Sequence, residues 1–123
     1  MKQLLFVFLG GGIGSALRYI VGKWINTTDQ LLPWSTFSVN IIGSLLIGLI
    51  LGWSLKSNTV SQNTILLLAT GFCGGFTTFS AFAYENVSLL KSGELVTALL
   101  YIFSSIVLGI CAVFLGIWIS NKM

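Results

Sequence analysis

The sequence predicts an all-α membrane protein with four transmembrane helices per subunit, of which the third is broken near its middle. Of the 123 residues, 55% are hydrophobic and only 7% are charged, and the mean hydropathy is +0.97. A soluble domain carries about a quarter charged residues, so this chain could not cover its surface with polar groups. The hydrophobic residues also form four runs long enough to cross a bilayer.

These runs set the expected boundaries, since a helix needs about 20 apolar residues to cross the hydrocarbon core. We expect spans over residues 4–25, 34–55, 64–90 and 95–119, all within a single transmembrane domain over residues 1–123. Short loops connect them, the first at residues 26–32. The four tryptophans fall at expected span ends, as an interfacial aromatic belt requires: Trp24, Trp34, Trp53 and Trp118.

Arg18 lies within the first span, about two turns from its end. Two interpretations stay open: its side chain extends to the interface, or it draws anions into a vestibule. Gly10 and Gly14 are four residues apart, a spacing that lets helices approach closely in lipid. Similar small-residue rows occur in the other spans, and the pattern does not say whether they pack within one chain or between chains.

The second span carries Thr36 and Asn40, four residues apart and therefore on one face of a helix. A membrane-buried amide is costly unless it is paired, and it is a candidate functional group. The alternative for Asn40 is an ordinary hydrogen bond between helices. We favour a functional role because other polar groups could converge on this side chain.

The third span contains the most informative segment, residues 71–82. Gly74 and Gly75 each weaken a helix by about 1 kcal/mol relative to Ala, and Thr77 and Thr78 then bring hydroxyls to membrane depth. Broken backbone at that depth is tolerated only where it is buried in protein or lines a wet cavity. The segment therefore predicts a break in the helix that belongs to a transmembrane pathway.

Aromatic side chains surround this break. We expect Phe72 and Phe76 to pack, whereas Phe79 and Phe82 flank Ser80 just past the break. An aromatic ring has a positive edge. An anion could therefore meet ring edges without meeting a fixed cation that would trap it.

Polar rows on three spans predict a polar track. The fourth span offers Tyr101 and Ser105, four residues apart, and the third offers a stripe of Thr77, Ser80 and Tyr84. Ordinary bonding between helices is the alternative. Glu85 follows on the third span, either as a proton-carrying carboxylate or as a hydrogen-bonding partner for Asn or Ser side chains.

Enzymatic and nucleic-acid functions find no support. The chain has no His, and it shows no nucleophile–base pair, metal-ligand cluster or phosphate loop. Cys73 and Cys111 lie in hydrophobic runs without metal-ligand spacing, which is typical of small packing residues. The six basic residues are spread along the chain rather than clustered, so nucleic acid is not the expected partner.

The basic residues are almost balanced across the membrane. With four spans, Lys2, Lys56 and Lys122 lie on one side, and Lys23 and Lys91 on the other, with Arg18 close to that end. The positive-inside rule therefore gives almost no preferred orientation. We predict that the chain inserts in both orientations and pairs antiparallel. The alternative is that so few charges carry no orientation signal.

Three motifs resemble the Fluc (CrcB) family of bacterial fluoride channels. They are Gly-Gly-Ile-Gly-Ser-Ala-Leu-Arg-Tyr at 11–19, Thr-Phe-Ser-Val-Asn-Ile-Ile-Gly at 36–43, and the broken-helix segment at 71–82. The resemblance covers essentially the whole chain. It implies an antiparallel, dual-topology homodimer with two fluoride pathways, which exports fluoride passively from the bacterial cell across its inner (plasma) membrane. Ala81 departs from the hydroxyl residue that relatives often carry.

The resemblance also implies roles for single residues. Phe79 and Phe82 match the aromatic box, and Asn40 the pore-lining amide. The remaining pathway positions are the polar track of Ser80, Tyr101 and Ser105, with Thr36 beside it, the vestibule arginine Arg18, and the carboxylate Glu85. A central structural Na⁺ is expected at the break, bound by the backbone carbonyls of Gly74 and Thr77 from two subunits.

Two other functions are weighed against a fluoride channel. A small dual-topology multidrug exporter also has four spans, but it needs a carboxylate in its first span, where this chain has Arg18. A non-conducting membrane assembly subunit could pack through glycine rows. It would not need three polar rows that converge on a helix break.

Overall fold

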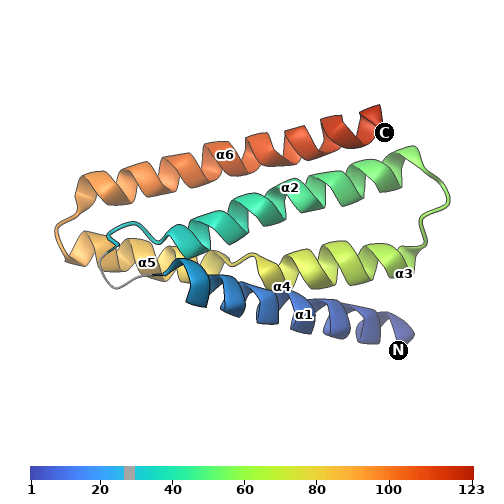
Figure 1. Ribbon diagram of the computed structural model, residues 1–123, viewed down its shortest axis with the longest axis horizontal. Helices are drawn as coiled ribbons and strands as arrows, with labels where there is room; N and C mark the ends of the chain where they lie inside the picture. Colours follow the sequence, from blue (N-terminus) through green and yellow to red (C-terminus); the bar gives the residue numbers. More distant parts are fainter. Residues whose placement is uncertain (27–29) are drawn as a thin grey trace.

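The computed structural model describes residues 1–26 and 30–123, and in these residues the fold is helical throughout (Figure 1). Among the described residues, four stretches are long and apolar enough to cross a membrane, as expected. The third stretch, Gln62–Lys91, is divided into several elements. In chain order the elements are α1 (Lys2–Ile25), α2 (Trp34–Lys56), α3 (Gln62–Ile65), the π-helix η1 (Leu66–Cys73), α4 (Gly74–Phe76), α5 (Phe79–Lys91) and α6 (Leu95–Lys122).

Successive spans run in opposite directions, so both termini lie at one end of the bundle (Figure 1). Helix α2 packs along α6, and α1 packs along η1 and α4. The predicted loop at 26–32 includes residues 27–29, which lie outside the described residues. The π-helix η1 was not predicted. Segments of this kind are rare and are frequent at functional sites.

Glycine brings α2 and α6 into backbone contact. A Cβ on Gly48 would collide with the main chain of Val113, and one on Gly116 would collide with the main chain of Leu45. A Cβ on Gly109 would meet only the Ser44 hydroxyl, at an ordinary 3.7 Å. These rows therefore pack helices within one chain.

A second glycine contact joins α1 to the third span. A Cβ on Gly10 would overlap the Leu67 carbonyl of η1, and one on Gly14 would overlap the Phe72 carbonyl. On the opposite side of the contact, Gly71 and Gly75 have no room for a side chain against α1. The main chains of α1 and the third span are therefore in direct contact just before the break.

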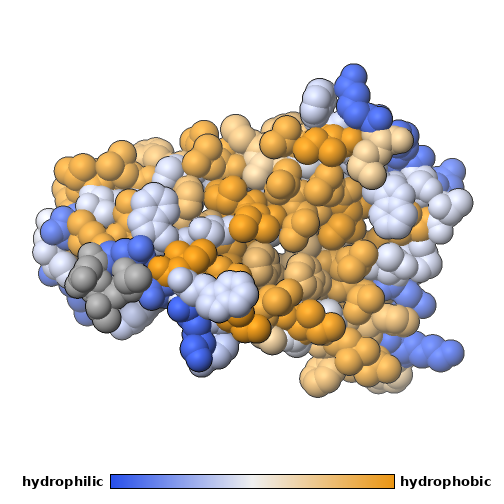
Figure 2. All heavy atoms as spheres, viewed as in Figure 1, coloured by the Kyte–Doolittle hydropathy of each residue, from blue (hydrophilic) through white to orange (hydrophobic). Residues whose placement is uncertain are grey.

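The surface matches a bilayer. Figure 2 shows apolar side chains over the middle of one face, with hydrophilic side chains mostly toward the ends. Large apolar residues such as Phe8, Leu100 and Phe114 are more than half exposed. Such a surface is a liability in water, but it is compatible with lipid or with another subunit.

Candidate functional site

The third span is interrupted at Thr77 and Thr78. Both residues are extended, with φ −87° and ψ 159° at Thr77 and φ −151° and ψ 120° at Thr78. Helix α5 begins directly after them. The Thr78 hydroxyl caps this helix by accepting a hydrogen bond from the N–H of Ala81 at 3.2 Å. The break thus falls inside the predicted segment, residues 71–82.

The glycine pair does not form the break, which corrects the reasoning from sequence. Gly74 and Gly75 are helical residues of α4. Gly75 is required by packing, because a Cβ there would collide with the Gly11 carbonyl of α1, whereas a Cβ on Gly74 would meet nothing within 4 Å. Side chains from neighbouring helices hold the extended residues instead.

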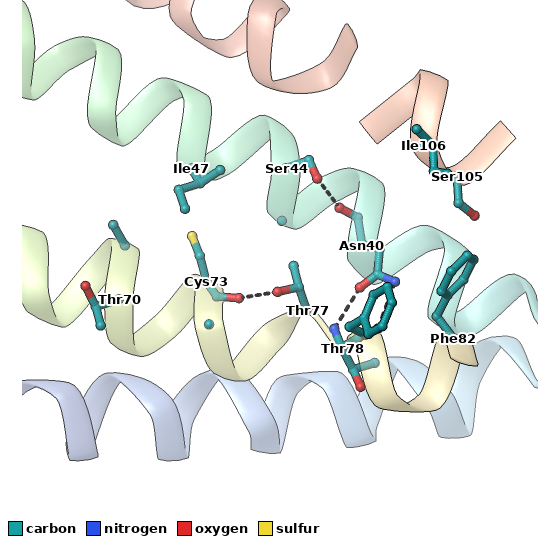
Figure 3. Close-up of a pocket in the computed structure, with 14 residues that line it drawn as sticks. Asn40, Ser44, Ile47, Thr70, Cys73, Thr77, Thr78, Phe82, Ser105 and Ile106 are labelled. Atoms are coloured by element: carbon teal, nitrogen blue, oxygen red, sulfur yellow. Dashed lines mark hydrogen bonds between the residues drawn. The ribbon is translucent and has the colours of Figure 1, made fainter. Parts of the chain in front are cut away.

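Asn40 of α2 is the first of these side chains. Its Nδ2 donates to the Thr78 carbonyl at 3.0 Å, and its Oδ1 accepts from the Thr78 N–H at 2.8 Å. Figure 3 shows the Asn40 amide facing Thr78 across the break. An amide carries two N–H donors, so one N–H of Asn40 has no partner among these contacts.

Two carbonyls before the break accept bonds from side chains. The Cys73 carbonyl accepts from the Thr77 hydroxyl at 2.8 Å as well as from the Thr77 N–H at 3.0 Å. The Gly75 carbonyl accepts from Arg18 Nε at 3.0 Å and from the Ser15 hydroxyl at 3.4 Å. Arg18 therefore reaches the break, which neither interpretation of the sequence anticipated.

A cavity of about 580 Å³ opens beside the break (Figure 3). Among the described residues that line it, none carries a charge. The Ser105 hydroxyl is buried there without a hydrogen-bond partner, and a buried polar group of this kind normally has one. The lining brings four of the nine predicted pathway residues together with the two residues of the break: Asn40, Phe79, Phe82 and Ser105, with Thr77 and Thr78.

The aromatic residues divide as expected from their positions. Phe79 is 78% exposed at the cavity, and its ring lies 5.7 Å from that of Phe82. Phe72 and Phe76 stack on each other with ring centroids 5.7 Å apart, and Phe76 is buried. The second pair thus contributes packing before the break, and the first pair borders the cavity after it.

Glu85 lies between two hydroxyl groups. Thr36 Oγ1 donates to its Oε2 at 2.8 Å, and the Tyr101 hydroxyl donates to its Oε1 at 3.2 Å. Tyr101 is 1% exposed, and its ring meets the ring of Phe82 edge-on at 5.0 Å. Glu85 is thus a hydrogen-bonding partner, of Thr and Tyr rather than of Asn and Ser, and Tyr101 connects it to the aromatic pair.

A second cavity, of about 660 Å³, is formed by α1, α2 and α5. Arg18 and Lys23 line it, and the described lining includes no acidic residue. Thr78 borders this cavity and the first one. The break therefore lies between a basic cavity and an uncharged cavity.

The predicted stripe on the third span is wrong in one respect. Thr77 precedes α5, so it does not share a helical face with Ser80 and Tyr84. Tyr84 is 72% exposed, and Ser80 lies with its hydroxyl 3.3 Å from the Thr78 hydroxyl. The capping role of Thr78 was not predicted, although Thr before an apolar helix is a preferred N-cap. Ser15 and Lys23 were not predicted at the site either, because the sequence holds no clear signal for them.

The sequence also matches a known protein family over most of its length. A family model described as "CrcB-like protein, Camphor Resistance (CrcB)" matches residues 5–117. The chain belongs to the CrcB family. The resemblance expected from the three motifs is thereby confirmed.

Several relatives match the chain over nearly its whole length. A protein of Flavobacterium psychrophilum is 45% identical over 127 residues, which cover 100% of both chains. A protein of Phocaeicola vulgatus is 51% identical over 125 residues, or 98% of this chain and 100% of the relative. One of Hyphomonas neptunium is 46% identical over 125 residues, or 100% of this chain and 98% of the relative. All three carry the name "Fluoride-specific ion channel FluC".

Proposed function

We propose that the protein is the subunit of a passive, fluoride-selective channel, a multi-pass protein of the bacterial plasma membrane that lowers the cytoplasmic fluoride concentration. Membership of the CrcB family and the names of the relatives support this function over a multidrug exporter or an assembly subunit. An ion channel is not an enzyme.

One observation carries the proposal: an uncharged cavity borders the helix break and presents weak donors. The unpartnered Asn40 N–H, the Ser105 hydroxyl and the edges of Phe79 and Phe82 are groups that can replace water around a small anion. No cation in that lining would trap the ion, while the neighbouring basic cavity raises the local anion concentration. The proposed pathway comprises Asn40, Phe79, Phe82, Ser80, Tyr101, Ser105, Thr36, Arg18 and Glu85.

The proposed channel is an antiparallel homodimer. In one subunit, Thr70, Gly74 and Phe79 are exposed although they lie at the break and line its cavity. A second copy related by a two-fold axis would cover these residues with the same surface. The near-balance of basic residues supports insertion in both orientations.

We further propose a structural Na⁺ bound by the carbonyls of Gly74 and Thr77. Continuing the helix would pair the Gly74 carbonyl with the Thr78 N–H, but that N–H donates to Asn40 Oδ1. Free carbonyls at a helix break suit Na⁺. When bound, the ion would neutralise the carbonyl dipoles at the break.

Fluoride efflux from liposomes tests the function. Purified protein in vesicles loaded with KF should release fluoride once valinomycin compensates the charge, and vesicles loaded with KCl should release chloride far more slowly. Protein-free vesicles are the control. Proton-coupled export of a cationic dye without halide flux would support the exporter, and no transport of either would support the assembly subunit.

A further inference from the structure

We propose that Arg18 is a positioning residue whose Nε–H holds the Gly75 carbonyl and thereby fixes the end of the half-helix before the break. The inference rests on the proposed function, because its importance lies in shaping the fluoride pathway. It assigns the essential contribution of Arg18 to one hydrogen bond rather than to its charge.

The Gly75 carbonyl needs a donor from outside its helix. In an uninterrupted helix it would accept from the N–H of residue 79, but Thr77 and Thr78 are extended and separate α4 from α5. An unsatisfied carbonyl at membrane depth is costly. Arg18 Nε supplies the shorter of the two side-chain hydrogen bonds to this carbonyl, at 3.0 Å, and the Ser15 hydroxyl supplies the longer one, at 3.4 Å.

The position of Arg18 on α1 follows from the glycine contact. Gly11 and Gly14 touch the third span, and Arg18 follows them by seven and four residues, on the same helical face. Side chains on a helix lean toward its N-terminus, so the Arg18 side chain extends back toward Gly75. The close approach of the two backbones brings the carbonyl within reach of Nε.

The remaining guanidinium nitrogens have a different environment. Arg18 also lines the basic cavity, and no hydrogen bond from Nη1 or Nη2 is found within the described residues. The positive charge could therefore act on anions or on the negative end of the half-helix, independently of Nε. An experiment must separate the N–H at the ε position from the charge.

Three substitutions make that separation. Gln carries its amide nitrogen at the ε position, three carbons beyond Cα, so Arg18→Gln keeps a donor at the place of Nε and removes the charge. Arg18→Lys keeps the charge but has a methylene at the ε position. Arg18→Met removes both the donor and the charge while filling similar space. Lys56→Gln is the control, because it removes a positive charge from the last residue of α2, far from the break.

The hydrogen bond can be observed without measuring transport. The sequence contains two Gly-Phe pairs, Gly71–Phe72 and Gly75–Phe76. Protein labelled with ¹³C at glycine carbonyls and ¹⁵N at phenylalanine therefore gives two carbonyl–nitrogen correlations, and Gly71 is the internal reference. We expect the Gly75 carbonyl signal to move in Arg18→Met and Arg18→Lys, and to stay near its wild-type position in Arg18→Gln, with Gly71 unchanged throughout.

Fluoride efflux per folded protein should follow the same order. Arg18→Gln is expected to keep flux within about threefold of wild type, whereas Arg18→Met and Arg18→Lys lose about tenfold or more, as loss of a hydrogen bond to a charged donor implies. The inference is overturned if Lys conducts normally and Gln does not, or if the Gly75 signal is the same in Arg18→Met as in wild type. Absence of flux in the wild-type protein would instead overturn the proposed function, while the carbonyl signals would still test the contact.

Discussion

The side-chain amide of Asn40 pairs with both backbone groups of Thr78, accepting from its N–H at 2.8 Å and donating to its carbonyl at 3.0 Å. One side chain thus does for Thr78 what a neighbouring strand would do. Because Arg18 holds Gly75 from α1, the break is fixed from two helices. These contacts therefore also position Phe79 and Phe82, which lie on α5 directly after the break.

Removing the Asn40 amide should therefore impair conduction and folding together. Asn40→Ala leaves the half-buried N–H and carbonyl of Thr78 without the Asn40 partner, and an unpaired buried group costs about 1–3 kcal/mol. Asn40→Asp keeps an acceptor but adds a charge where it is costly. We expect fluoride efflux to fall about tenfold or more in both, with Asn58→Ala in an exposed loop as control. Wild-type flux in Asn40→Ala would show that the amide is dispensable.

Two glycines of α1 should differ sharply on substitution by Ala. Gly14→Ala forces a methyl group into the Phe72 carbonyl, whereas a Cβ on Gly12 meets nothing within 4 Å. We expect Gly14→Ala to lower the thermal midpoint and the yield of folded protein. Gly12→Ala should be neutral or stabilising by up to about 1 kcal/mol through helix propensity. Thermal unfolding in detergent measures both, and equal midpoints would contradict the proposed packing of α1.

Much of this architecture could be predicted because composition and periodicity are strong signals in a membrane protein. The four-span, all-helical fold follows from hydrophobic runs, and the break in residues 71–82 follows from Gly and Thr at membrane depth. The position of the break within that segment did not follow. Gly74 and Gly75 are weak helix formers, yet both are helical and the break comes after them. Gly75 is required because it packs against α1.

Polar residues that repeat at helical spacing pointed to Thr36, Asn40, Tyr101 and Ser105. The structure places Thr36 and Tyr101 against Glu85, and Asn40 and Ser105 at the cavity beside the break. The sequence could not show which residues hydrogen-bond to one another. Arg18 and Gly75 are 57 positions apart, and their hydrogen bond depends on how α1 packs against the third span. The π-helix was equally hidden, since residues 66–73 have the composition of an ordinary apolar helix.

The aromatic pathway can be separated from aromatic packing. Phe79→Ile and Phe82→Ile remove the ring edges but keep bulk, and we expect a sharp drop in fluoride efflux with the protein still assembled on size-exclusion chromatography. Phe79 is the cleaner test, because its side chain is largely exposed within the subunit. Phe72→Ile, in the stacked pair, should alter stability more than flux. Normal conduction in both Phe79→Ile and Phe82→Ile would refute the aromatic pathway.

Two tyrosines on neighbouring helices provide a matched test of the Glu85 cluster. Tyr101→Phe removes the donor to Glu85 Oε1 from a residue that is 1% exposed. It should lower stability by about 1 kcal/mol and reduce fluoride efflux. Tyr84→Phe removes the same hydroxyl from an exposed side chain and should change neither property. If the two variants behave alike in unfolding and efflux measurements, the cluster has no role.

The last prediction concerns the proposed second subunit. A side chain at Gly74 meets nothing within the subunit, so Gly74→Val should leave the fold of one chain intact. An antiparallel partner that covers the break would approach this position, and the added side chain should then block the dimer and disrupt the proposed Na⁺ site. We expect a monomer by size-exclusion chromatography with light scattering, together with loss of fluoride efflux.

Gly12→Val is the matched control, because Gly12 is equally open within the chain but lies away from the break. It should remain dimeric and conducting. Wild-type protein should also show a thermal midpoint that rises with Na⁺ and not with choline, since an ion at the proposed site would stabilise the folded dimer, and Gly74→Val should lose this dependence. A Gly74→Val protein that stays dimeric, conducts and responds to Na⁺ as wild type does would place the dimer contact elsewhere on the subunit.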